Sequence, residues 1–172
     1  MENEPSSLLA EEVREWNTPL LGAYLLWEFT SGYKEAHSDN ASPIGILHFI
    51  ALALLTNPRL AKYVSNKRSS LQSFALGIEE NKLTDQLLSL QERISQRKQH
   101  TLESIDAAIS AGLLVWDSNT GIIYPVELRK KPSHGKNLKA TVKSYGAKSR
   151  LLGNWFSAHD IFTIANYLRV TL

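Results

Sequence analysis

The chain has 172 residues, of which 43% are hydrophobic, and it carries a formal net charge of +2. This length fits one domain with its own core, so we predict a single domain over residues 1–172. The absence of cysteine excludes disulfides, iron–sulfur clusters and thiol catalysis, and it fits the reducing cytoplasm in which we expect the protein to act.

The charges are unevenly distributed along the sequence. The first residues are acidic, and Met1 to Ser7 carry two glutamates and no basic residue, so we expect no signal peptide and disorder over residues 1–10. From Leu128 to His159 there is no acidic residue, against eight lysines and arginines. This asymmetry predicts a basic surface near one end of the molecule.

The first three strong helix signals share one pattern, an oxygen-bearing capping residue followed by proline. They are Thr18-Pro19, Ser42-Pro43 and Asn57-Pro58. The first helix is apolar nearly all round, so we expect it to be central and to end near Ser31-Gly32, with a polar loop over 34–41. The second should be fully buried, because its apolar run Ile44 to Leu55 rises only about 18 Å, too short for a membrane core of about 30 Å.

Further elements follow up to the middle of the chain. They are a helix over Leu71–Ile78, a helix capped by Thr84, a helix capped by Thr101 that ends at a left-handed Gly112, and a hairpin of Leu113–Asp117 with Ile122–Val126. Pro125 lacks a ladder donor and places its strand at an edge. The order helix, helix, hairpin is typical of a winged helix.

These patterns predict a mostly α fold, a helical domain with a winged-helix-like segment and one β-hairpin. Residues 16–126 should form the winged-helix-like core, residues 127–139 a basic loop, and residues 140–172 the C-terminal helices. The first of those helices should run from Ala140 to about Trp155, and Ser157 with Asp160 resembles a capping box for the last.

The sequence lacks the spacings that carry chemistry. None of the five histidines is paired at a metal-ligand spacing, and neither a phosphate-binding loop nor a nucleophile elbow occurs. The adjacent acids Glu11-Glu12 and Glu79-Glu80 point in different directions on a helix. We therefore predict a binding protein rather than an enzyme, with no catalytic residue, cofactor or metal.

Nucleic-acid binding stays open as an alternative, including a winged-helix DNA-binding transcriptional regulator. The helix after Thr101 should expose Glu103, Asp106 and Ser110, and carboxylates facing phosphates would be repelled. The basic stretch is the better candidate for contact with nucleic acid or an acidic partner, and a solvated surface is the simpler interpretation. Its candidate residues are Arg129, Lys130, Lys131, Lys136, Lys139 and Lys143. We expect the four tryptophans to lie mostly in the core.

One segment near the C-terminus carries a family resemblance. It reads Ala147-Lys148-Ser149-Arg150-Leu151-Leu152-Gly153-Asn154-Trp155-Phe156-Ser157 and is followed by Thr163-Ile164. Near the start, Trp16-Asn17-Thr18-Pro19 precedes an apolar helix and then Gly32-Tyr33. In order and spacing over residues 16–172, the chain resembles the middle components of three-component ABC systems, although that family often has an arginine where this chain has Asn154.

The resemblance implies a role rather than a reaction. Such middle components are similar to the accessory subunit of Lamassu-type antiphage systems, encoded between an effector and an SMC-like or Rad50-like ATPase. The implied partners are an ATPase dimer and an effector subunit, often a nuclease, with DNA reached through the complex and no membrane. The motif residues Trp16, Asn17, Leu152, Gly153, Trp155 and Phe156 are then expected at a partner interface or in the core of the motif.

Overall fold

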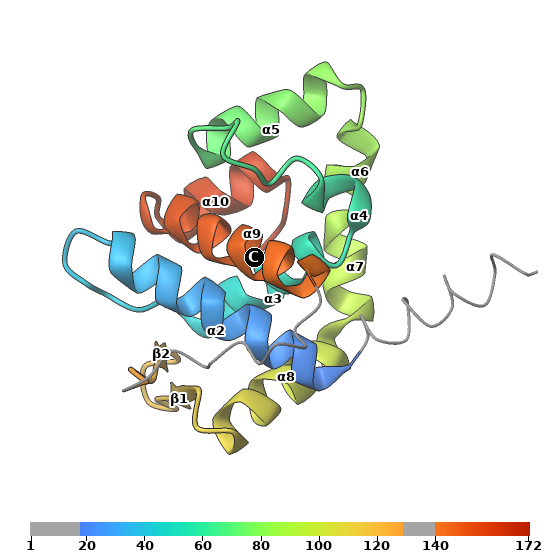
Figure 1. The fold of residues 1–172 in the computed structure, drawn as a ribbon. Coiled ribbons are helices and arrows are strands. Elements are labelled where there is room, and N and C mark those ends of the chain that lie inside the picture. Colours follow the sequence, from blue (N-terminus) through green and yellow to red (C-terminus); the bar gives the residue numbers. More distant parts are fainter. Residues whose placement is uncertain (1–17, 129–139) are drawn as a thin grey trace, which may run out of the picture.

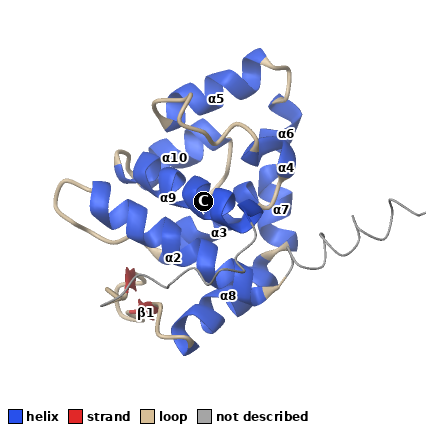
Figure 2. Ribbon diagram, in the orientation of Figure 1, coloured by secondary structure: helices blue, strands red, loops and turns tan. Residues whose placement is uncertain are grey.

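The computed structural model describes residues 18–128 and 140–172, and it confirms a mostly helical fold with one hairpin (Figure 2). The elements in chain order are α2 (Pro19–Ala36), α3 (Gly45–Leu55), α4 (Pro58–Ala61), α5 (Leu71–Glu80), α6 (Thr84–Leu88), α7 (Leu90–Gln96), α8 (Lys98–Ser110), β1 (Leu114–Trp116), β2 (Ile123–Pro125), α9 (Ala140–Ser157) and α10 (Ile161–Leu168). Within the described ranges, no helix combines the length and apolar character needed to cross a membrane.

Helix α2 lies between α9 on one side and α8 with the hairpin on the other (Figure 1). It packs against α9, α8 and α3. On one side, Phe29 belongs to a buried cluster that includes Phe74 of α5 and Phe156 of α9. On the other side, Leu25 and Trp27 join a second cluster with residues of α8 and the hairpin. One helix therefore ties both halves of the core together.

Two of the three proline-led helix starts are confirmed, and the third is wrong. Thr18 caps α2, and the side chain of Asn57 accepts from the backbone of Arg59 at the start of α4. In contrast, α3 begins at Gly45, because the hairpin engages the preceding backbone. The carbonyl of Pro43 accepts from the nitrogen of Ile123 at 3.0 Å, and Ile44 pairs with Ile122 as an antiparallel bridge.

The predicted end of α2 is also wrong, since the helix continues through Gly32 to Ala36. The reason is packing: a Cβ at Gly32 would lie 2.9 Å from the carbonyl carbon of Arg150 on α9. This glycine allows a close approach between helices rather than marking a terminus. The predicted loop over 34–41 accordingly begins only after Ala36.

The predicted caps at Thr84, Thr101 and Ser157 are wrong as well. Thr84 is the first residue of α6, and Thr101 lies inside α8, where its hydroxyl donates to the carbonyl of Arg97. Ser157 closes α9, whereas Asp160 caps α10 by accepting from two backbone nitrogens at 2.9 Å. A threonine or serine inside a helix can donate to the carbonyl four residues earlier, and its sequence alone does not distinguish it from a capping residue.

The helix at Leu71 and the hairpin are confirmed. Ser70 caps α5, strands β1 and β2 pair antiparallel with Val115 opposite Tyr124, and Gly112 has a φ of +70°. The winged-helix arrangement of this segment stays a prediction. The expectation of a fully buried second helix is wrong at its start, where Ile46 is exposed.

Candidate partner-binding cleft

Helices α2 and α9 cross closely because α9 presents small residues to α2. Gly146 and Gly153 are seven residues apart, two turns of helix, and so share one face. A Cβ at Gly153 would lie 2.7 Å from the backbone nitrogen of Tyr33, and one at Gly146 would lie 2.8 Å from the ring of Tyr24. A larger residue at Gly153 would meet the backbone of α2 and push the helices apart, whereas at Gly146 it would displace the side chain of Tyr24.

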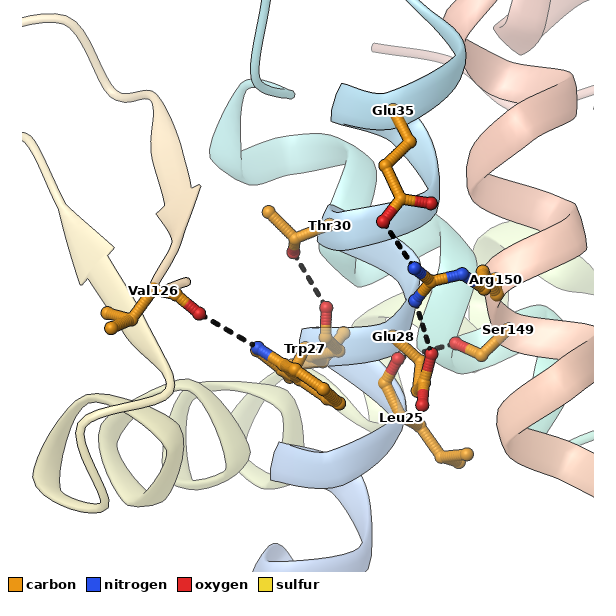
Figure 3. A network of polar contacts seen from close by, with 9 residues as sticks. Leu25, Trp27, Glu28, Thr30, Glu35, Val126, Ser149 and Arg150 are labelled. Atoms are coloured by element: carbon orange, nitrogen blue, oxygen red, sulfur yellow. Dashed lines mark hydrogen bonds and ion pairs between the residues drawn. The ribbon is translucent and has the colours of Figure 1, made fainter. Parts of the chain in front are cut away.

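Polar side chains between these glycines bond the two helices together (Figure 3). The Ser149 hydroxyl, which is fully buried, donates to the carbonyl of Leu25 at 2.5 Å. Arg150 donates to the carboxylate of Glu28 at 2.7 Å and also pairs with Glu35. The side chain of Glu28 is only 13% exposed, whereas that of Glu35 is 62% exposed.

The surroundings of Arg150 keep its charge. Burial alone would lower the pKa of this guanidinium, but hydrogen bonds and charge attraction from Glu28 and Glu35 outweigh it, so the pKa is raised. The Glu28 carboxylate also affects the pKa of Tyr24. Burial first, and then the charge and hydrogen bond of Glu28, raise the pKa of Tyr24 to about 12. The phenol is therefore a neutral hydrogen-bonding group at physiological pH.

A cleft of about 640 Å³ opens beside this network, between α2, α9 and the chain that leaves β2. Its wall is fixed by Trp27, whose indole nitrogen donates to the carbonyl of Val126 at 3.4 Å (Figure 3). The lining includes Tyr24, Trp27, Lys34, Glu127, Lys143 and Arg150. The cleft thus combines aromatic faces with charged rims.

The charges of the cleft are nearly all used within the fold. Glu28 and Glu35 are held by Arg150, and Lys34 lies 3.4 Å from Glu127. Lys143 is exposed and forms no ion pair with any residue that the structure describes. This lysine is therefore available to a carboxylate or phosphate from outside. Aromatic faces and an exposed lysine suit recognition of a partner.

The basic residues expected to contact nucleic acid or an acidic partner are only partly described. Lys143 lies at the cleft, while Arg129, Lys130, Lys131, Lys136 and Lys139 lie outside the described residues. Two other cations of the acid-free stretch point inward. Arg150 bonds α2, and the Lys148 ammonium donates to the carbonyl of Ala61 at 2.6 Å.

The described motif residues serve the packing of α9. Leu152, Trp155 and Phe156 are buried, and the ring centroids of Phe156 and Phe29 lie 5.5 Å apart at an edge-to-face angle of 88°. Gly153 forms the crossing point with α2. Trp16 and Asn17 lie outside the described residues. The described part of the motif is therefore the surface of α9 that packs against α2 and the core.

Two features of the surface were not predicted. The pairing of Glu28 and Glu35 with Arg150 was missed, although a lone glutamate between Trp27 and Phe29 indicates a cation nearby. Trp116 was expected in the core but is 40% exposed, unlike Trp27 and Trp155. Among the described residues there is no cluster of three or more metal-ligating side chains.

Comparison with protein-family models gives a match over nearly the whole chain. A family model described as middle component 3 of ABC-three-component (ABC-3C) systems matches residues 6–172. The matched range includes every described element, from α2 to α10, and both walls of the cleft. Searches of curated proteins and of solved structures found no match.

Proposed function

The chain belongs to the middle component 3 family of ABC-three-component systems, and we propose that it is a non-catalytic adaptor. In this proposal it bridges an SMC-like or Rad50-like ATPase dimer and an effector subunit, often a nuclease. The complex would be a Lamassu-type defence system acting in the bacterial cytoplasm against phages or plasmids. The observation that carries the proposal is the family match over nearly the whole chain, since a middle component is one part of a multi-component system.

The surface of the protein supports a bridging role. A bridge needs two separate contact regions, and the described residues form at least two concave surfaces that share no lining residue. One is the cleft between α2 and α9 with the available Lys143 at its rim. The other is an apolar pocket at the start of α3. Interfaces of this kind combine aromatic or aliphatic anchors with a polar rim.

Co-expression tests the bridging proposal directly. We expect the tagged chain to co-purify with both the ATPase and the effector of its own system, and we expect those two subunits to separate when the chain is omitted. A chain that stays a solitary monomer beside its ATPase would contradict the proposal. So would turnover of a substrate by the pure polypeptide that depends on one of its own polar side chains.

A second experiment concerns the basic stretch, which we propose contacts DNA held by the ATPase. Charge reversal at Lys130, Lys131 and Lys136 should weaken DNA-dependent activation of the complex while leaving its assembly intact. Loss of assembly would instead assign these lysines to a protein contact. Salt dependence separates the two, because each phosphate contact adds to the steepness with which DNA affinity falls as salt rises.

A winged-helix DNA-binding regulator is not favoured by the structure. In that alternative α8 would enter the major groove, yet Glu103 and Asp106 lie exposed on it. Its opposite face, which includes Ser104 and Ile105, is buried. A carboxylate-bearing helix surface would meet phosphate repulsion rather than attraction.

A further inference from the structure

We propose that the apolar pocket at the start of α3 is a docking site for an apolar segment of a partner polypeptide that carries a carboxylate facing Lys98. The choice of partner rests on the proposed function, in which the ATPase and the effector are the candidate owners of that segment. The pocket has a volume of about 440 Å³. Its principal side chains are Ile44, Ile46, Phe49, Ile94, Trp116 and Lys98.

The hairpin creates this pocket by holding the chain before α3 in an extended form. The nitrogen of Gly45 donates to the carbonyl of Gly121 at 2.7 Å, and the nitrogen of Ile123 donates to the carbonyl of Pro43 at 3.0 Å. Because helix α3 begins only at Gly45, Ile44 and Ile46 remain at the surface. Ile44 has an extended backbone and Ile46 lies in the first turn of α3, and both side chains line the same pocket.

The apolar residues that line the pocket come together from three distant parts of the chain, and among them Ile94 is partly buried while Ile44, Ile46 and Trp116 are exposed. Ile44 and Ile46 lie at the start of α3, Ile94 on α7 and Trp116 at the end of β1. Ile46 and Trp116 are each 40% exposed. A large apolar side chain exposed singly needs no explanation, but a group that shares one pocket is the usual mark of an interaction site. Tryptophan is also among the residues that most often dominate binding energy.

The charge of the pocket identifies the chemistry of the occupant. Lys98 is the first residue of α8, is exposed, and forms no ion pair with any residue in the described part of the chain. None of the described residues lining the pocket is acidic. An occupant that brings a carboxylate would satisfy this ammonium at the rim. A second copy of the same face would instead bring a second Lys98, and like charges across an interface oppose association.

The test uses the full-length chain and overlapping peptides tiled across the ATPase and effector subunits of its own system. We expect at least one bound peptide to contain apolar residues with an Asp or Glu beside them. Ile46→Asp and Lys98→Glu should each weaken that binding at least tenfold, and replacing the peptide's acid with lysine should restore binding to the Lys98→Glu variant. Melting temperatures establish that each variant is folded.

Leu88→Asp provides the matched control. Leu88 is 61% exposed on α6 and does not line this pocket, so its replacement should leave peptide binding unchanged. The docking proposal is overturned if every bound peptide lacks an acid or ignores both pocket variants. It is also overturned if the chain forms a concentration-dependent dimer that Ile46→Asp abolishes, since the occupant is then a second copy.

The docking proposal and the proposed function can fail separately. If the wild-type chain assembles with ATPase and effector, but no peptide or complex depends on Ile46, only the docking site is wrong. If the wild-type chain assembles with neither subunit, the proposed function is wrong.

Discussion

His48 is a buried imidazole held between α2 and α3. Its Nε2 lies 2.8 Å from the hydroxyl of Thr30, and its ring packs edge-on against Phe29 at 5.3 Å. Burial lowers the pKa of His48 to about 4, although the backbone carbonyls of Ile44 and Gly45 favour its charged form. The imidazole is therefore neutral in the folded protein at physiological pH. Its place in the core explains why a histidine interrupts the apolar run of α3.

The lowered pKa of His48 predicts acid destabilisation. In the unfolded chain its pKa is near 6.5, so between pH 6.5 and pH 4 the imidazole is mostly protonated in the unfolded state and mostly neutral in the folded state. Its contribution is fully present above pH 6.5 and is lost as pH falls toward 4. The free energy of unfolding should drop by about 2 kcal/mol between pH 7.5 and pH 5.0.

Urea titrations at the two pH values measure this effect. His48→Gln is the control, because it keeps a polar side chain but cannot titrate. Contributions from all other groups are common to both proteins, so the wild type should lose more stability on acidification than the variant. An equal loss in both would show that His48 is not the cause.

Gly153 predicts a second effect at a single residue. Alanine normally stabilises a helix relative to glycine, by about 1 kcal/mol. At Gly153 the added Cβ would meet the backbone of α2, and we expect Gly153→Ala to destabilise the protein by about 2–3 kcal/mol. Thermal unfolding monitored by circular dichroism measures the change. Ser144→Ala, at an exposed position of the same helix, should have little effect. A stabilised Gly153→Ala variant would show that the helices do not cross at this glycine.

At the scale of elements, local chemistry predicted most of the elements but not all of their ends, and it gave α6 and α7 as a single helix that begins at Thr84. Apolar patterns with a cap or a tight turn beside them predicted α2, α5 and the hairpin, since these signals act within a few residues. The errors at Gly32 and Pro43 have a different origin. Each is decided by a contact with a segment remote in sequence, α9 for Gly32 and β2 for Pro43. A single sequence contains no record of such pairings.

The same limit applies to the candidate sites. Lys143 was predicted from the acid-free basic stretch and is exposed, while the basic surface itself stays a prediction. The network of Arg150 could not be assembled, because Glu28 and Glu35 lie more than a hundred residues away. The sequence likewise did not predict that Ile46 and Trp116 are exposed. Their exposure depends on the hairpin holding the chain before α3, which no short-range pattern indicates.

The ion pairs between α2 and α9 should be unequal. In double-mutant cycles we expect Arg150→Met with Glu28→Gln to give a coupling energy of about 1 kcal/mol, because Glu28 is largely shielded from water. Arg150→Met with Glu35→Gln should give a coupling of about 0.3 kcal/mol, since the exposed Glu35 is screened by solvent. Urea unfolding of the single and double variants measures both. A larger coupling for Glu35 would contradict the burial seen at this crossing.

At the scale of the whole molecule, the fold is closed by its last helices. Phe29 of α2 and Phe156 of α9 share one cluster with residues of α3, α5 and α10. Ile164 and Leu168 of α10 are buried in that cluster too. Helix α2 therefore obtains its main partner, α9, from a segment that lies more than a hundred residues later in the sequence. Contacts this remote in sequence carry a large loop-closure cost and make folding depend on the entire chain.

This dependence predicts the outcome of truncation. A chain that ends at Leu128 lacks α9 and α10, and it removes the Phe156 ring from Phe29 and the Ser149 hydroxyl from the carbonyl of Leu25. We expect it to lose cooperative thermal unfolding and to bind a dye for exposed apolar surface, because one face of the buried α2 then meets water. Removing only Thr171 and Leu172 should leave the transition in place, since both are exposed and the one hydrogen bond that they form with the described residues joins the backbone nitrogen of Thr171 to Gln91. A cooperative transition in the chain that ends at Leu128 would mean that residues 1–128 are a domain on their own. The α2–α9 crossing would then be a contact between two domains rather than the centre of one.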